Sequence, residues 1–110
     1  MDHVIIKMGE LLAEFPDGYT LALSSFELVK KGWVVPLKDA QNFTGETGLP
    51  EALVVASRTT RTISGWKEGD LLFWDVVMVF DDEEVATFAA RKTGTMMIYQ
   101  IETGRVKWLN

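Results

Sequence analysis

The longest apolar stretch of the chain is the run LLFWDVVMVF at 71–80, which only Asp75 interrupts. A run of this length between turn residues predicts a strand that is buried on both of its faces. Side chains alternate along a strand, so the face that carries Asp75 is expected to carry Phe73, Val77 and Val79 as well. This strand therefore needs cover on two sides of the sheet.

The residues before this run predict its partner strand. Glu68-Gly69 suits a two-residue hairpin turn. Residues 62–67 and 71–80 are therefore expected to form an antiparallel pair.

Two shorter strands are expected near the end of the sequence, at 95–101 and 105–109, with Glu102-Thr103-Gly104 as the turn between them. In the last strand, Val106 and Trp108 alternate with two basic residues. This alternation is typical of a half-exposed edge strand, and it predicts that Val106 and Trp108 face the core.

A helix is predicted over residues 82–92, between these two hairpins. Asp81 is the expected cap, because an acidic residue follows it three positions later, as in a capping box. The apolar residues Val85, Phe88 and Ala89 recur at helical spacing and predict the core-facing stripe.

The first half of the chain shows a looser version of the same pattern. Residues 19–23 and 33–37 are apolar enough to predict two strands. Residues 4–15 are ambiguous, although 10–15 fit a helix that the turn Pro16-Asp17-Gly18 would end.

Residues 49–59 fit either a helix or a strand. The helix is favoured by four apolar positions at helical spacing, Leu49, Ala52, Leu53 and Ala56. The adjacent β-branched pair Val54-Val55 would also suit a strand, so both interpretations stay open.

Together these elements predict an α+β fold in residues 1–110, organised as a single domain. Its order is hairpin, helix, hairpin, helix, hairpin. Short hairpins joined by single helices favour a mainly antiparallel sheet with two helices packed on one face.

Two helices cannot easily cover both faces of such a sheet. Three solutions exist for the face of Phe73, Val77 and Val79: the amino-terminal segment folds over it, the sheet curls around it, or another protein covers it. The last solution gives the first functional hypothesis. It is a small binding or accessory protein that associates, as a homodimer or with a protein partner, through this apolar face.

Asp75 supports a second hypothesis. A carboxylate among apolar neighbours costs several kcal/mol unless it is paired or hydrogen-bonded, so it is either part of a structural pair or a polar anchor in a pocket. A small enzyme or ligand-binding protein would have its cleft between Asp75, Trp66 and the polar loop 41–47. The loop residues of interest are Gln41, Asn42, Thr44, Glu46 and Thr47.

Composition narrows the chemistry further. The chain has no Cys and one His, His3, so neither a zinc site nor a Ser–His–Asp triad is expected, and no catalytic residue, metal or cofactor is assigned. A net charge of −5 without a basic stripe makes nucleic acid an unlikely partner. The first fifteen residues lack the pattern of a signal peptide and no apolar run is long enough to span a membrane, so we expect a cytoplasmic protein.

The order of short motifs also resembles a known group of proteins. GYTL, KKGWVV, AQNFTGETGL, the stretch from SGWKEGD to ARKTG, and MMIYQIETGRVKWL follow one another over about residues 18–109. In this order they resemble an uncharacterised family of small bacterial proteins, some of them associated with phages or mobile elements. The resemblance implies a bacterial origin and an accessory role, and it carries no catalytic residue over to this chain.

Overall fold

The computed structural model describes residues 2–45 and 47–109, and the described residues form three helices and eight strands. The helices are α1 (Asp2–Glu14), α2 (Gly48–Arg58) and α3 (Glu83–Thr93). The strands are β1 (Tyr19–Ala22), β2 (Glu27–Leu28), β3 (Trp33–Pro36), β4 (Phe43–Thr44), β5 (Thr62–Glu68), β6 (Leu71–Phe80), β7 (Met97–Gln100) and β8 (Val106–Trp108). The ambiguous segment at the start is thus one continuous helix.

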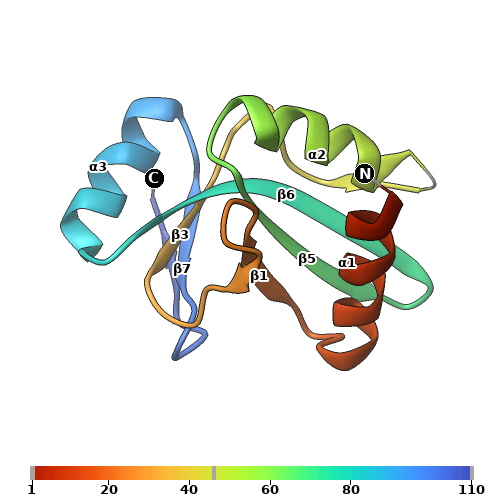
Figure 1. Cartoon of the computed structure of the whole chain (residues 1–110). Coiled ribbons are helices and arrows are strands. Elements are labelled where there is room, and N and C mark those ends of the chain that lie inside the picture. Colours follow the sequence, from red (N-terminus) through yellow and green to blue (C-terminus); the bar gives the residue numbers. More distant parts are fainter. Residues whose placement is uncertain (1, 46, 110) are drawn as a thin grey trace.

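All strands join one antiparallel sheet in the order β2-β1-β5-β6-β3-β7-β8, and β4 pairs with β6 beside β3. This confirms the predicted α+β fold with a mainly antiparallel sheet. The long strand β6 runs through the middle of the molecule (Figure 1). Its hairpin with β5 turns at Gly69-Asp70, one residue later than the predicted Glu68-Gly69, because Glu68 still pairs with Leu71.

The three helices pack on one face of this sheet. Trp74 and Val76 of β6 join the apolar cluster under α1 and α2, whereas Met78 and Phe80 pack against the cluster under α3. These four residues alternate along β6 and so point to the same face. The helix layer therefore has two parts, with α1 and α2 over one end of β6 and α3 over the other (Figure 1).

Helix α2 forms where the sequence left two interpretations open. The four positions with helical spacing, Leu49, Ala52, Leu53 and Ala56, are all buried in the cluster under α1 and α2. The helical interpretation is confirmed. Val54, by contrast, is exposed on the outer side of the helix.

The predicted core-facing side of α3 is wrong. Asp82, rather than Asp81, caps the helix by accepting hydrogen bonds from the backbone amides of the second and third residues after it. Val85 and Phe88 are 50% and 68% exposed, and the buried residues are Ala86 and Ala90. Alanines face the sheet here because the opposite side of the cluster is already filled by large side chains, Trp33, Ile98 and Leu109.

The last strand lies at the edge of the sheet as predicted, but the side that was expected to face the core is wrong. Lys107 points toward α3, where its amine donates to the Glu83 carboxylate at 3.0 Å and to the Thr87 hydroxyl at 2.9 Å. Since neighbours on a strand face opposite ways, Val106 and Trp108 lie on the face away from α3. They are 50% and 69% exposed.

The sheet is strongly curved, with the helices on its convex side. The Tyr99 hydroxyl of β7 donates to the Ser64 hydroxyl of β5 at 3.3 Å, although β3 and β6 lie between these strands. In a flat sheet the two strands would be about 14 Å apart, which one tyrosine side chain cannot bridge. Val77 is completely buried on this concave side, while Phe73 and Val79 are half-buried. Of the three solutions left open for this face, curvature of the sheet is therefore the one that covers Val77.

Candidate functional site

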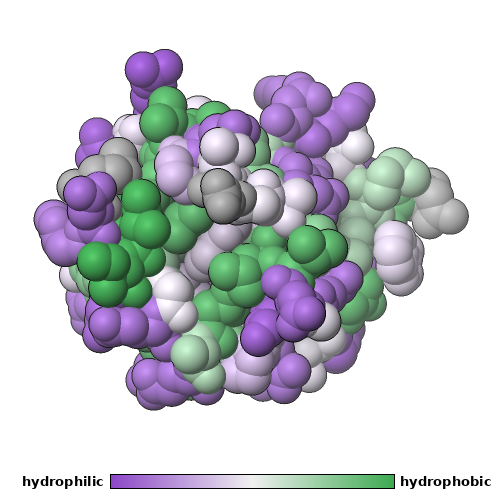
Figure 2. Space-filling model, turned by 90° about the vertical axis from the view of Figure 1, so that its right-hand side faces the viewer, coloured by the Kyte–Doolittle hydropathy of each residue, from purple (hydrophilic) through white to green (hydrophobic). Residues whose placement is uncertain are grey.

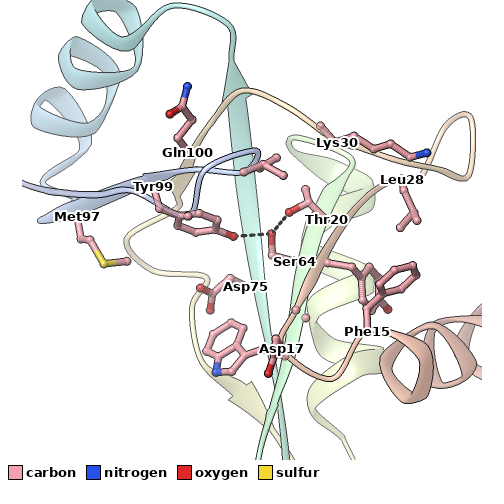
Figure 3. A pocket seen from close by; sticks show the side chains of 17 residues that line it. Phe15, Asp17, Thr20, Leu28, Lys30, Ser64, Asp75, Met97, Tyr99 and Gln100 are labelled. Atoms are coloured by element: carbon pink, nitrogen blue, oxygen red, sulfur yellow. Dashed lines mark hydrogen bonds between the residues drawn. The ribbon is translucent and has the colours of Figure 1, made fainter.

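A groove of about 740 Å³ lies on the concave side of the sheet. Strands β1, β5, β6 and β7 contribute Thr20, Ser64, Asp75 and Tyr99 to its lining. Residues of the α1–β1 connection and of the segment after β2 line it from the sides (Figure 3). Side chains from widely separated parts of the chain thus meet around one space.

Polar groups form a row along the inner surface of the groove. Thr20, Ser64 and Asp75 are direct neighbours across β1, β5 and β6, so the three side chains point to the same side. The Thr20 and Ser64 hydroxyl oxygens are 2.7 Å apart, and Tyr99 donates to Ser64 from the opposite side (Figure 3). The result is a chain of three linked hydroxyls next to one carboxylate.

Asp75 lies where β6 passes from one neighbouring strand to the next. Along the edge of β6 that faces away from β5, pairing with β4 ends at Trp74 and pairing with β3 begins at Val77. The connection between β3 and β4 fills the interval, and the Asn42 amide donates to Asp75 Oδ1 at 2.7 Å. In the described part of the chain, this is the one hydrogen bond that the carboxylate accepts, although Asp75 is only 9% exposed.

An aromatic pair borders the row of polar groups. The rings of Trp66 and Phe73 are stacked with centroids 5.5 Å apart and planes 13° from parallel, and the Trp66 indole lines the groove. Gly65, between the polar Ser64 and Trp66, has no side chain because the Trp74 ring occupies that space from the convex side. The groove thus combines apolar walls with a few converging polar atoms.

Burial sets the acid–base properties of the site. It raises the pKa of Asp75 above its ordinary value, and the hydrogen bond from Asn42 opposes this only in part. Burial likewise raises the pKa of Tyr99, and the nearby charge of Asp75 acts in the same direction. In both groups the main cause is loss of solvation on burial, which disfavours the charged form.

Charged groups at the border of the groove are few. Apart from Asp75 and the two tyrosines, the ionisable side chains that line the groove are those of Asp17 and Lys30. Both are exposed. The Lys30 amine points away from Asp75 and Tyr99 in Figure 3. Across residues 2–45 and 47–109, no three His, Cys, Asp or Glu side chains lie close enough together to hold a metal ion. In the same residues, no helix is both long and apolar enough to cross a membrane.

The structure brings together part of the predicted site. Asp75 and Trp66 line the same groove, and Asn42 from the polar loop contacts Asp75 through its backbone amide rather than its side chain. Gln41 and Thr44 are not part of the groove lining, and Thr44 instead pairs with β6. The predicted loop residue Glu46 lies outside the described residues.

The three hydroxyl residues of the polar row, Thr20, Ser64 and Tyr99, are not among the predicted site residues. The signal for Ser64 was present in the hairpin, because the correct turn places it directly opposite Asp75. Thr20 is likewise a polar residue within an apolar strand. No signal in the sequence could have placed Tyr99 here, because its position depends on the curvature of the whole sheet.

In comparisons with protein-family models, curated proteins and solved structures, nothing matches this chain. The resemblance to small bacterial proteins over residues 18–109 therefore stays a prediction. What the protein does must be inferred from the groove and from the surface around it.

Proposed function

We propose that this protein binds a small organic ligand in the concave groove. The observation that carries the proposal is Asp75, a nearly buried carboxylate that faces the groove and accepts a single backbone hydrogen bond within the described residues. A buried carboxylate without further donors is unfavourable, and a ligand that supplied one would remove this cost. A cytoplasmic accessory role in a bacterial cell belongs to the same proposal.

The composition of the groove supports this choice. Ligand sites are usually concave and mostly apolar, with a small number of polar groups that orient the ligand. A volume of about 740 Å³ falls within the range of about 300 to about 1,000 Å³ that is common for such sites. Trp66, which is stacked on Phe73, offers a flat apolar wall, and the hydroxyls of Thr20, Ser64 and Tyr99 offer polar contacts.

Binding accounts for the groove better than catalysis does. The Ser64 hydroxyl contacts two other hydroxyls in the described structure, and neither of these is a base that could activate it as a nucleophile. Asp75 is the one carboxylate in the row of polar groups, and the other carboxylate of the groove lining, Asp17, is exposed.

The proposal can be tested by titrating the ¹⁵N-labelled protein with a set of small aromatic amines, alcohols and carboxylic acids. Amide resonances of Thr20, Ser64 and Tyr99 should shift together in a saturable way. Trp66→Ala should weaken this binding, whereas the matched change Trp108→Ala, outside the groove lining, should not. If no compound shifts the groove resonances, or if Trp108→Ala weakens binding as much as Trp66→Ala, the proposal is wrong.

A second candidate function is association with a second copy of the chain or with another protein. The observation that favours it is the exposure of large apolar side chains at the α3 end, namely Val85, Phe88, Met96, Val106 and Trp108. Exposed apolar residues also occur on α1, α2 and β6 at the other end, where Figure 2 shows hydrophobic areas separated by hydrophilic ones. Those residues are Ile6, Val54, Leu71 and Leu72. Phe73 and Val79 belong to the sheet face that the sequence suggests for association. Because both are half-buried in the curved sheet, we favour the α3 end as the association surface.

Light scattering over a range of concentrations tests this second function. An associating protein should show a mass that rises with concentration, and the double change Phe88→Ser and Trp108→Ser should abolish the rise. A monomeric mass at all concentrations excludes self-association.

A further inference from the structure

We infer that the ligand of the concave groove is an organic amine cation with an aromatic or otherwise apolar body, whose protonated nitrogen pairs with Asp75. This inference rests on the proposed function, because it assigns the ligand class for the same groove. The protein leaves part of the hydrogen-bonding capacity of this groove unused.

The polar oxygens in the groove can accept further hydrogen bonds. The Asp75 carboxylate accepts from Asn42 through Oδ1, and no described residue donates to Oδ2. The Tyr99 hydroxyl uses its proton toward Ser64, so its oxygen keeps acceptor capacity. One of the Thr20 and Ser64 hydroxyls donates to the other, so an oxygen of this pair also accepts. Acceptors on several sides call for a ligand that donates, and a protonated amine donates through each of its N–H groups.

Charge distinguishes among possible donors. Among the ionisable side chains that line the groove, Asp75 is the buried carboxylate, whereas Asp17 and Lys30 are exposed. A cation would restore the favourable electrostatics that this carboxylate loses on burial, whereas a phosphate or carboxylate ligand would face a like charge. Lys30 could attract an anion, but its amine points away from the polar row (Figure 3).

The apolar walls of the groove indicate the shape and polarity of the rest of the ligand. The Trp66 ring is stacked on Phe73 and lies along the groove together with Phe15. A flat apolar body would fit against the Trp66 ring, and aromatic faces also attract nearby cations. The site therefore suits an aromatic amine better than a compact inorganic cation.

Three probes of nearly the same size separate charge from shape: phenethylamine, 2-phenylethanol and phenylacetate. Each has the same ring, and their end groups are cationic, neutral and anionic at pH 7. In titrations of the ¹⁵N-labelled protein, phenethylamine should bind at least about tenfold more tightly than 2-phenylethanol, as expected for a hydrogen bond to a charged group. Phenylacetate should bind more weakly than the alcohol.

The variant Asp75→Asn keeps the size of the side chain and removes its charge. It should bind 2-phenylethanol about as well as the unaltered protein, while the preference for phenethylamine should disappear. The same preference should grow as pH rises through the pKa of Asp75, with Tyr99, Asp17 and Lys30 as the other titratable groups nearby, and this growth should be absent from the variant.

The outcomes separate the inference from the proposed function. If the alcohol and the amine bind equally well, or if Asp75→Asn keeps the preference, the ligand is not an amine cation, although the groove still binds ligands. If none of the three probes shifts the groove resonances, the inference fails, and the proposed function fails with it only if the wider set of compounds shifts none either. Loss of all binding in Asp75→Asn while the variant stays folded would make Asp75 essential to the shape of the groove, which contradicts a role limited to charge.

Discussion

The two ends of the helix layer pack against the sheet with helix side chains of different size. Under α1 and α2, Trp74 is 1% exposed and belongs to the larger apolar cluster. At the α3 end, Trp108 is 69% exposed, and the helix presents Ala86 and Ala90 to the sheet. One end of the molecule is held by large side chains from both layers, and the other combines large side chains from the sheet with small ones from the helix.

The difference shows that apolar spacing identifies a helix but does not decide which of its sides is buried. In α3, Glu83, Ala86, Thr87 and Ala90 also follow helical spacing, and this stripe faces the sheet. It is favoured because Glu83 and Thr87 bind Lys107, while alanines allow close packing on Trp33. The apolar stripe with Val85 and Phe88 is left in contact with solvent.

The largest contrast is expected from the same substitution at each end. Trp74→Ala should lower the free energy of unfolding by about 3 to about 5 kcal/mol, because it opens a cavity in the core. Trp108→Ala should change it by no more than about 0.5 kcal/mol, as for an exposed residue. Urea denaturation measures both values. Equal losses for the two variants would show that Trp108 is buried by an interaction in solution.

A smaller effect is expected at Gly65, which allows Trp74 to pack against β5. A Cβ at this position would overlap the Trp74 ring, so Gly65→Ala should destabilise the protein by about 1 to about 3 kcal/mol through overpacking. The matched control is Gly9→Ala in α1, where nothing lies within 4 Å of the added carbon. It should stabilise the helix by about 0.5 to about 1 kcal/mol. A neutral result for Gly65→Ala in the same denaturation assay would contradict the tight packing described for this end.

The starts of α2 and α3 reverse this order, because α3 begins with a side-chain cap and α2 begins without one. Asp82 accepts two backbone hydrogen bonds at the start of α3, so Asp82→Ala should cost about 1 kcal/mol. Thr47, at the start of α2, makes no such bond, and Thr47→Ala should stay within about 0.5 kcal/mol. Thermal unfolding of both variants checks the order. If Thr47→Ala were the more damaging change, the start of α2 would depend on contacts other than a side-chain cap.

The effect expected to be smallest is a dependence of stability on pH that arises where the two ends meet. Burial raises the pKa of Asp75 above its ordinary value of 3.8, so the unfolded chain releases this proton at lower pH than the folded chain does. The contribution of Asp75 to stability is therefore complete below 3.8 and is lost as pH rises through its raised pKa. Urea midpoints of the unaltered protein and of Asp75→Asn, measured across this range, should diverge in favour of the variant as pH rises. A constant difference at all pH values would exclude the raised pKa.

Local patterns were sufficient for most of the fold. Strand β6, its hairpin with β5 and the stripe of α2 all follow from spacings of a few residues, and the structure confirms them. The errors concern which side of an element is covered. For α3 and β8 this depends on partners from other parts of the chain, such as Glu83 for Lys107, which no local pattern contains.

The site was predicted to a smaller extent for the same reason. Asp75 is predicted because a carboxylate in an apolar strand is unusual, and Trp66 because an aromatic ring that follows a glycine at the start of a strand can lie partly open. The approach of Tyr99 to Ser64 depends on sheet curvature, which accumulates over several strands and has no signature at any one residue.

The position of Asp75 at the midpoint of β6 couples the groove to the whole sheet. Pairing with β4 ends just before Asp75 and pairing with β3 begins just after it. The two halves of the sheet, β2-β1-β5 and β3-β7-β8, are therefore joined through β6. Any flattening of the sheet would separate Tyr99 from Ser64 and widen the groove. A ligand that touched Asp75 and Tyr99 together would act as a brace between the half-sheets, and its binding would slow amide hydrogen exchange in strands that it never contacts.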